Sequence, residues 1–330
     1  MNFWDRLSKP ILALAPLADV TDSAFRRLIA KYSKVPGGIP YVTWTEFVSA
    51  DGLVRAPEEG RKKLMKGFEY SQSERPIVAQ LFSGRPEMME EAAKLVESLG
   101  FDGLDINMGC PDRSIEKSGA GAALIKNPKL AREIIRAAKR GAPSLPVSVK
   151  TRLGYNKDEL EAWLPELLAE EPAVITVHAR TRKEMSLVPA RWERVKRAVE
   201  IRDKFGSKTL VLGNGDVPDP ETGLALCEET GADGAMLGRA IFGTPNLFAH
   251  SAELAYGQER IDVRKTLEIL LEHTKLFDEL LGDTKNFAIM KKHFKAYVAS
   301  FPGSSELRSK LMETVEASEV ETIILSFLNK

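Results

Sequence analysis

The segment NMGCP (107–111) places a cysteine between a glycine and a proline, directly after an apolar run. A thiol with an ordinary pKa of about 8.5 stays largely protonated at pH 7, so Cys110 can donate a proton without special tuning. Pro111 favours an extended backbone at Cys110, which helps to aim the thiol from a short loop. A lone cysteine is more often a buried, inert side chain. Taken alone, the segment therefore favours a packing residue over a thiol with a chemical role.

Polar residues also end most of the other short apolar runs in the chain. Taken singly, each is a candidate cap or loop hydrogen bond. Taken together, they predict a site wherever the ends of these runs meet. These residues are Glu46, Gln80, Asn107, Lys150, His178 with Arg180, Asn214 with Asp216, and Gly238 with Arg239.

Eight β-branched runs alternate with longer amphipathic stretches, as expected for repeated βα units around a parallel sheet. The stretch 86–100, for example, has apolar residues at helical spacing and ends on a glycine. We therefore predict an α/β fold, a (β/α)8 TIM barrel over residues 1–245, with its active site at the carboxyl ends of the strands. The predicted strands are 11–16, 41–46, 76–82, 103–107, 146–152, 173–180, 208–214 and 234–239.

Beyond residue 257 the sequence pattern changes, because strand-like apolar runs stop and only helical patterns remain. This change predicts a smaller C-terminal all-helical domain over residues 258–330. One stretch in it has apolar residues at alternating steps of three and four, which predicts a single helix with a continuous apolar stripe. The stripe residues are Phe287, Met290, Phe294, Tyr297 and Phe301.

Four lysines accompany this stripe without belonging to it: Lys285, Lys291, Lys292 and Lys295. A charged outer helix face accounts for such lysines in most proteins. A patch that contacts nucleic-acid phosphates is the alternative, and it predicts salt-dependent binding. The sequence leaves both interpretations open.

Two glycine-bearing segments follow the last predicted strands, GNGDV (213–217) and GADGAMLGRA (231–240). In (β/α) barrels the loops after strands seven and eight commonly bind a phosphate group. Glycines permit the close backbone approach, and Arg239 can add a bidentate contact. The sequence contains neither a G-x-G-x-x-G after a strand nor a P-loop, so a Rossmann or P-loop nucleotide site has no support.

The composition is that of an ordinary globular protein. Lys plus Arg balances Asp plus Glu at 47 each, so the net charge gives no evidence for a nucleic-acid partner. Of the two cysteines, Cys227 lies in a helical pattern and is expected to pack there as a free thiol. No apolar run approaches the roughly 20 residues of a membrane span, and no signal peptide is visible, so we expect a cytoplasmic protein. His178 has no second ligand at metal-binding spacing, so no metal site is expected.

Taken in order, these segments are similar to those of a known family. LAPLADVTDSAFRRL, VAQLF, GLDINMGCPDRSIEKSGAGAALIKNP, PVSVKTRLG, HARTR, VLGNGDV, GADGAMLGRA and MKKHFKAYVASFPGSSELR cover nearly the whole chain. The chain resembles the tRNA-dihydrouridine synthases, FMN-dependent reductases built on a barrel followed by a helical domain. The N-x-G-C-P block is the most specific element of the resemblance.

The resemblance implies a role for each matching residue. Cys110 is the general acid that protonates C5 of a uracil ring while hydride from the reduced flavin reaches C6, and NADPH reduces the flavin. Asn107 and Arg180 contact the substrate, and the lysines Lys285, Lys291, Lys292 and Lys295 contact tRNA. The protein is expected to act as a monomer. The FMN-binding residues are Pro16, Leu17, Ala18, Gln80, Lys150, His178, Asn214, Gly215, Asp216, Gly238 and Arg239.

One segment departs from the family pattern. Family members usually have H-G-R-T where this chain has His178-Ala179-Arg180-Thr181, and the following loop, 183–191, is divergent. The departure bears on which uridine is chosen. Two other functions stay open: a flavin-dependent reductase of a small pyrimidine or enone on a related barrel, and a tRNA-binding protein whose chemistry has lapsed.

Overall fold

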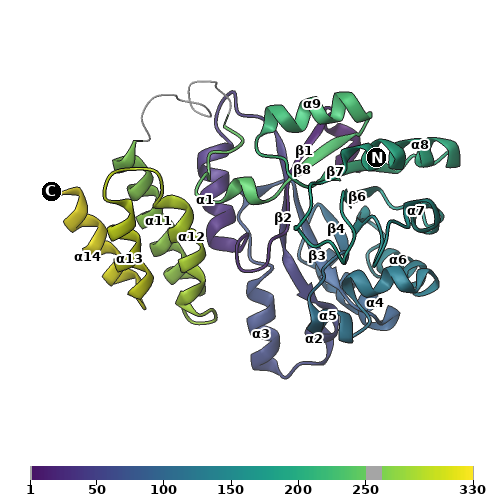
Figure 1. Cartoon of the computed structure of the whole chain (residues 1–330). Coiled ribbons are helices and arrows are strands. Elements are labelled where there is room, and N and C mark those ends of the chain that lie inside the picture. The colour runs from purple at the N-terminus through teal and green to yellow at the C-terminus, as the bar shows by residue number, and fades with distance from the viewer. Residues whose placement is uncertain (1, 250–261, 330) are drawn as a thin grey trace. The chain divides into compact units, whose positions relative to one another are not determined.

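The computed structural model describes residues 2–249 and 262–329, and its strands form a closed parallel barrel (Figure 1). Each strand pairs with the next along the chain, and the last pairs with the first. The predicted (β/α)8 barrel is thereby confirmed. The strands are β1 (Ile11–Leu14), β2 (Tyr41–Ser49), β3 (Ile77–Phe82), β4 (Gly103–Met108), β5 (Val147–Arg152), β6 (Val174–His178), β7 (Leu210–Asn214) and β8 (Gly234–Leu237).

The strands follow the predicted runs with small differences at their ends. The longest difference is in β2, which extends to Ser49 because Phe47, Val48 and Ser49 pair with Gln80, Leu81 and Phe82 of β3. A register shift between Trp44 and Phe47 precedes this pairing.

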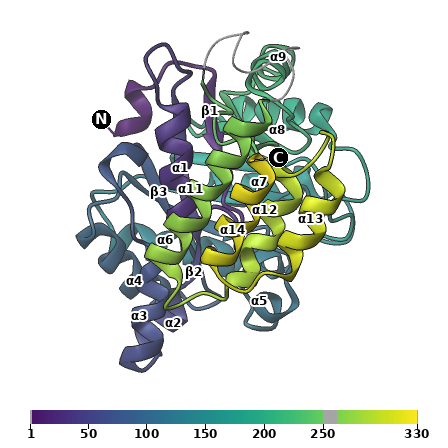
Figure 2. The same cartoon turned by 90° about the vertical axis from the view of Figure 1, so that its left-hand side faces the viewer.

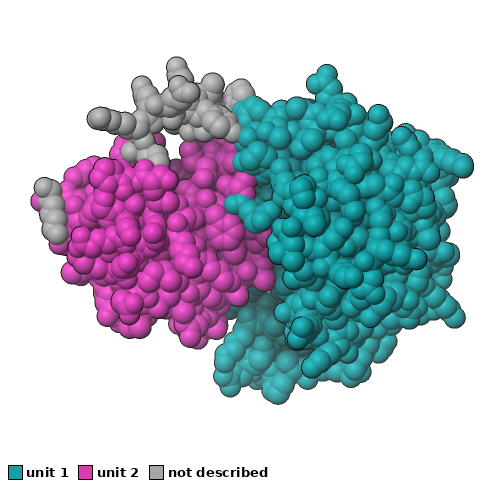
Figure 3. Space-filling view, in the orientation of Figure 1, with its two compact units in different colours: residues 1–16, 41–68, 75–239 teal, residues 17–40, 69–74, 240–330 magenta. Residues whose placement is uncertain are grey.

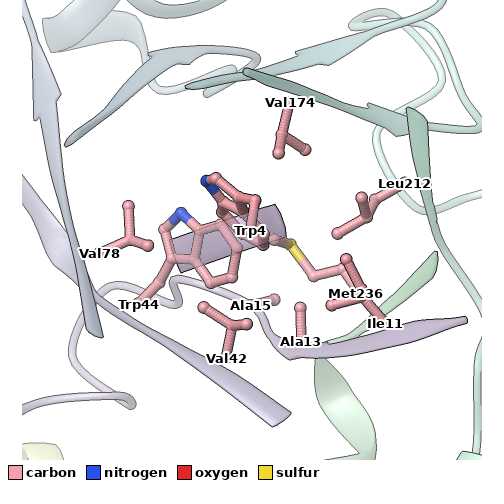
Figure 4. Close-up of a cluster of buried hydrophobic side chains, with 10 residues drawn as sticks. All are labelled: Trp4, Ile11, Ala13, Ala15, Val42, Trp44, Val78, Val174, Leu212 and Met236. Atoms are coloured by element: carbon pink, nitrogen blue, oxygen red, sulfur yellow. The ribbon is translucent and has the colours of Figure 1, made fainter. Parts of the chain in front are cut away.

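Side chains from alternate strand positions fill the barrel interior. Trp4, on the 3-10 helix η1 (Phe3–Arg6), packs against Trp44 of β2 with ring centroids 5.8 Å apart. Figure 4 shows these two rings among small and branched side chains from the surrounding strands. Because side chains alternate between the two faces of a strand, the polar residues discussed below also lie on the inner face of β3 to β7.

Helices follow the strands as the βα rhythm predicts. Pro86 begins α4, and Gly100, with φ of 73°, follows its end, as expected for a left-handed terminator. The helices around the barrel are α2 (Ala50–Arg55), α3 (Glu58–Lys66), α4 (Pro86–Ser98), α5 (Arg113–Lys117), η3 (Gly121–Lys126), α6 (Pro128–Gly141), α7 (Leu160–Leu168), α8 (Trp192–Phe205) and α9 (Pro220–Thr230).

The chain divides into two compact units (Figure 3). Unit 1 comprises residues 1–16, 41–68 and 75–239 and contains the whole barrel sheet. Unit 2 comprises residues 17–40, 69–74 and 240–330. The predicted start of the helical domain, residue 258, lies outside the described residues.

Unit 2 includes the helix that follows the first strand. In it α1 packs against α11, and Arg26 of α1 forms a fully buried ion pair with Glu74 of η2, Nε to Oε2 2.8 Å. Its elements (Figure 2) are α1 (Ser23–Ser33), η2 (Gln72–Glu74), α11 (Val263–Leu281), η5 (Phe287–Ile289), α12 (Met290–Tyr297), α13 (Ser304–Glu313) and α14 (Ala317–Leu328); η4 (Arg239–Ile241) begins at the last residue of unit 1.

The expectation of one helix through the apolar stripe is wrong. Phe287 lies in η5, and α12 ends at Tyr297, so Phe301 follows in a turn. Ser300 has φ of 63°, which no regular helix accommodates, and Pro302 follows it. Met290, Phe294 and Tyr297 are nevertheless buried together, so the apolar spacing identified the buried face correctly.

Two histidines lie buried in unit 2. The rings of His273 and His293 are 4.4 Å apart between centroids, and Phe25 stacks on His273 at 4.6 Å. Among residues 2–249 and 262–329, neither ring nitrogen of His293 has a hydrogen-bond partner. Burial lowers the pKa of His293 to about 3 and that of His273 well below its usual value. Both rings are therefore neutral in the folded protein at pH 7.

Because both buried rings are neutral, we expect the folded protein to lose stability in mild acid. Below pH about 6.5 the unfolded chain protonates each ring while the folded chain does not, so unfolding becomes easier by about 1.4 kcal/mol per pH unit per histidine. His293→Leu should remove one such contribution, so its urea stability should fall less than that of the wild type between pH 7 and pH 5. Equal falls in the two proteins would contradict this account.

Two optical signals locate the effect in the chain. All four tryptophans, Trp4, Trp44, Trp163 and Trp192, belong to unit 1, so their fluorescence reports the barrel alone, whereas far-UV circular dichroism reports both units. The smaller loss of urea stability between pH 7 and pH 5 in His293→Leu should therefore be seen when unfolding is followed by circular dichroism.

Candidate active site

Polar side chains meet at the carboxyl ends of β4 to β7. The strand register pairs Asn107 with Lys150, and His178 with Asn214. Lys150 Nζ donates to Asn214 Oδ1 at 3.1 Å, and Asn214 Nδ2 donates to the carbonyl of Met236 on β8 at 2.8 Å. Hydrogen bonds thus join β5, β7 and β8 at this end of the barrel, and the strand register brings Asn107 and His178 beside them.

The Cys110 loop is held by backbone hydrogen bonds. Asn107 Oδ1 accepts from the N–H groups of Gly109 at 3.1 Å and Cys110 at 2.9 Å. The Cys110 carbonyl accepts from Ala122 N–H at 3.0 Å. Gly121, with φ of 60°, allows this approach, because a Cβ there would lie 2.8 Å from the Cys110 carbonyl oxygen. The small residues after the cysteine therefore fix the loop that carries the thiol.

The thiol of Cys110 is half-buried and protonated. Burial raises its pKa above the usual value, and the nearby Asp112 carboxylate acts in the same direction. The Asp112 backbone N–H and the positive charges of Arg152 and Lys150 oppose this rise without reversing it. A side chain in this state can serve as a proton donor but is a poor nucleophile at neutral pH.

Lys150 places a positive charge inside the barrel. Burial lowers its pKa to about 8, with the neighbouring Arg152 acting in the same direction and the carboxylate of Asp105 opposing it. The ammonium group thus remains mostly charged at pH 7. Its half-buried position on the inner face of β5 and its hydrogen bond to Asn214 argue against an ordinary solvated surface lysine.

His178 is neutral and fixed in one tautomer. Burial lowers its pKa well below the usual value, and the positive charges of Lys150 and Arg152 lower it further. Arg180 Nη1 lies 3.2 Å from His178 Nε2. Because a guanidinium can only donate, Nε2 accepts and the ring proton is on Nδ1.

Arg180 connects the divergent loop to the loop after β7. Its side chain is nearly fully buried, donates to the Val188 carbonyl at 2.6 Å and forms an ion pair with Asp216. Asp216 also accepts from Arg239 at 2.7 Å and from Ala190 N–H at 2.9 Å. These contacts give Arg180 a structural task, and its predicted contact with substrate stays a prediction.

The remaining predicted residues divide between the two units. Gly215 and Gly238 lie directly after β7 and β8, and the Arg239 side chain is 65% exposed. Pro16 is buried directly after β1, whereas Leu17 and Ala18 belong to unit 2. Cys227 is buried on α9, as expected for a packing residue.

The predicted lysines lie in unit 2 around α12. Lys292 Nζ is 3.3 Å from Asp19 and Lys285 Nζ is 3.8 Å from the same carboxylate. Lys292 and Lys295 are exposed on α12, and Lys291 is half-buried there. The charges of Lys292 and Lys285 are therefore partly neutralised by Asp19 within unit 2.

Two charged residues inside the barrel escaped the sequence analysis. Arg152 donates to three backbone carbonyls, those of Gly109 at 2.8 Å, Thr181 at 3.1 Å and Met185 at 3.0 Å, and burial lowers its pKa to about 10. Asp105 is fully buried on β4. The sequence contained a signal for both residues. Arg152 follows Lys150 by two positions and Asp105 precedes Asn107 by two, so each pair lies on one face of its strand.

Over residues 2–249 and 262–329, no three His, Cys, Asp or Glu side chains cluster in a way that could hold a metal ion. Within the same residues, no helix combines the length and the apolar character that crossing a membrane requires.

A parallel barrel with such a polar rim is the architecture of a β/α-barrel enzyme. Comparison with known proteins identifies which family of these enzymes is involved. The model of the dihydrouridine synthase (Dus) family matches residues 13–329, and the chain belongs to this family. The family consists of flavin-dependent oxidoreductases, so the chain is an enzyme of that class.

Two curated relatives match along the whole chain. The chain is 38% identical to a "Probable tRNA-dihydrouridine synthase" of Staphylococcus aureus (strain COL), over 99% of this chain and 95% of that protein. It is also 38% identical to the "Probable tRNA-dihydrouridine synthase 2" of Bacillus subtilis (strain 168), over 100% of this chain and 97% of that protein. Histamine dehydrogenase from Rhizobium sp. 4-9 shares the fold, with a TM-score of 0.52 at 14% identity over 80% of this chain and 48% of that one.

The packing of Gly215 generates a stability prediction. Gly215 has φ of 120°, and a Cβ there would lie 2.9 Å from Ala190 Cβ and 3.2 Å from His178 Cδ2. Gly206 also has positive φ, 75°, but no atom lies within 4 Å of its Cβ position. Gly206→Ala should cost about 1 kcal/mol from backbone strain alone, and Gly215→Ala at least about 1 kcal/mol more because its neighbours must move. Urea unfolding of the two variants measures the difference, and equal costs would show that the loop after β7 has room.

Proposed function

We propose that the chain is a tRNA-dihydrouridine synthase that binds FMN and reduces the C5–C6 double bond of a uridine in tRNA, with NADPH as the reductant. It acts as a monomer in the cytoplasm. The observation that carries the proposal is the protonated thiol of Cys110, held by Asn107 on a fixed loop beside the buried charge of Lys150. This pair supplies a proton donor for the double bond and a cation that favours a reduced flavin.

The residues present fit FMN. Gly215 leaves no space for a side chain in the loop after β7, so only backbone can face a ligand there. The exposed guanidinium of Arg239 has donors beyond the one that contacts Asp216, which suits a single phosphate group. The charge of Lys150 suits a ring that becomes anionic on reduction. Asn214, Gly215, Gly238 and Arg239 would hold the ribityl phosphate, and Gln80, Lys150 and His178 the ring.

The chain's own residues account for the proton and for the binding of the base. When bound, reduced FMN supplies the hydride for C6 of the uracil ring. Cys110 transfers its thiol proton to C5, so that the two additions together saturate the bond. Asn107 Oδ1 is occupied by two backbone N–H groups, so its free N–H can only donate, which suits a carbonyl oxygen of the base. Lys150 remains charged and favours the reduced ring.

The two other functions are separated by simple measurements. A reductase of a small pyrimidine or enone would reoxidise its flavin with the free base as fast as with tRNA. A tRNA-binding protein without chemistry would bind tRNA but take up no FMN. A colourless protein that fails to bind FMN in a titration would therefore overturn the proposal.

Replacement of Cys110 should separate the two halves of the reaction. In Cys110→Ala, reduction of the flavin by NADPH should be normal, because it needs no proton at C5. Reoxidation by unmodified tRNA should slow by about 10²–10⁴, the usual loss for a positioned acid. Cys110→Ser should rescue little, because a hydroxyl is a much weaker acid. Anaerobic stopped-flow absorbance measures both steps, and equal reoxidation by wild type and Cys110→Ala would return Cys110 to a packing role.

The lysines of unit 2 should carry part of the affinity for tRNA. Replacing Lys285, Lys291, Lys292 and Lys295 by Gln should weaken tRNA binding and reduce its salt dependence, because each lost phosphate contact lowers the slope by about 0.7–0.9. Asp19→Asn should have the opposite effect, since it frees the two lysines that Asp19 neutralises.

A matched control removes the same number of charges elsewhere. Lys62, Lys63, Lys196 and Lys204 are exposed on α3 and α8 of unit 1, and their replacement by Gln should leave the slope unchanged. Fluorescence anisotropy of labelled tRNA at several salt concentrations provides the measurement. If the two quadruple variants behave alike, the lysines around α12 are only a solvated face.

A further inference from the structure

A fully buried carboxylate lies one layer below the proposed active site. Asp105 is on β4, two residues before Asn107, so both side chains point into the barrel. Its Oδ1 accepts from Ser148 Oγ at 2.6 Å, and its Oδ2 accepts from Gln80 Nε2 at 2.6 Å. Nothing in the proposed chemistry uses this carboxylate, although burying it carries a high cost.

The hydrogen bond to Gln80 is the first link of a continuous chain. Gln80 Oε1 accepts from Asn107 Nδ2 at 3.1 Å. Asn107 Oδ1 in turn accepts the N–H groups of Gly109 and Cys110, at 3.1 and 2.9 Å. The chain therefore runs from the Asp105 carboxylate, through two side-chain amides, to the backbone of the loop that carries the thiol.

The polarity of the groups at the two ends gives this chain a direction. An ionised carboxylate only accepts, and a backbone N–H only donates. Each amide between them satisfies both ends in a single orientation, with its nitrogen toward Asp105 and its oxygen toward Cys110. If the carboxylate is removed, the Gln80 N–H that faces it loses its hydrogen-bond partner in a buried position, which destabilises this arrangement of the amides.

We propose that Asp105 is a positioning residue: its carboxylate is the terminal acceptor of the Gln80–Asn107 chain and thereby holds the Cys110 loop in place without touching the reacting groups. The chain of hydrogen bonds does not depend on the proposed function. Its value for proton transfer by Cys110 does rest on that function. Because the amides are locked, Gln80 and Asn107 each keep one further N–H that these hydrogen bonds do not use.

Asp105 has a second effect, which is on Lys150 in the layer above it. Its negative charge opposes the lowering of the Lys150 pKa, so it favours the charged form of that lysine. Ser148 donates only to the other oxygen of Asp105 and takes no part in the chain. This difference between the two partners of Asp105 provides a matched control.

Hydrogen exchange of the backbone tests the proposal without cofactor or substrate. In Asp105→Leu, exchange of the Gly109 and Cys110 amides should rise at least tenfold, relative to the buried amides of α6. Asp105→Asn should restore most of the protection, because an amide oxygen can still accept from Gln80 while its nitrogen donates to Ser148. Ser148→Ala should leave the exchange unchanged, since the bond to Gln80 remains. If Asp105→Leu exchanges faster throughout the barrel, with no excess at Gly109 and Cys110, Asp105 is only a core residue.

A measurement on the wild-type protein covers the case in which Asp105→Leu does not fold. The chain predicts that side-chain amide protons of Gln80 and Asn107 exchange slowly with solvent in NMR spectra of the selectively labelled protein. Rapid exchange of both amides would overturn the proposal. These readouts need neither FMN nor tRNA, so their failure is distinguishable from a failure of the proposed function.

Discussion

The architecture of the site depends on burying charge at the carboxyl end of the barrel. Lys150 and Arg152 on β5 and Asp105 on β4 leave water on folding, and an unpaired buried charge costs several kcal/mol. Three backbone carbonyls offset the cost for Arg152, and two of these belong to the loop after β6. The third is that of Gly109, beside the cysteine. Arg152 thus links the loops after β4 and β6, and its hydrogen bond to Gly109 helps to hold the loop that carries Cys110.

The same buried charges set the protonation of the reactive groups. Burial raises the pKa of Cys110, and the nearby cations limit this rise but do not cancel it, so the thiol keeps its proton. For His178, burial and the cations act together and keep the ring neutral. Burial also raises the pKa of Asp105, to about 6, so this carboxylate is ionised at pH 7 and can serve as an acceptor. One layer of the barrel therefore contains a proton donor, a neutral imidazole and a retained cation.

The sequence predicted the barrel and its rim because a period of two and a βα rhythm need no long-range information. By the same period Arg152 and Asp105 were within reach of sequence analysis, since they share a face with Lys150 and Asn107. The pairing of Arg180 with Asp216, 36 residues apart, was not, because it depends on how two loops fold together. The apolar spacing through Phe301 concealed the end of α12 at Tyr297, after which Val298 leaves the helical conformation with ψ of 73°. Membership of α1 in unit 2 likewise depends on contacts that the order of elements does not specify.

The most direct test of the account is a product measurement under anaerobic conditions. Purified protein loaded with FMN is given NADPH and unmodified tRNA, and NADPH oxidation is compared with dihydrouridine mapped in the RNA. Once the bound FMN has been reduced, the account predicts one dihydrouridine formed for each further NADPH oxidised, at a defined position, and NADPH oxidation that stops at one equivalent per FMN when free uracil replaces tRNA. Continued oxidation of NADPH without any reduced uridine in the tRNA would contradict it.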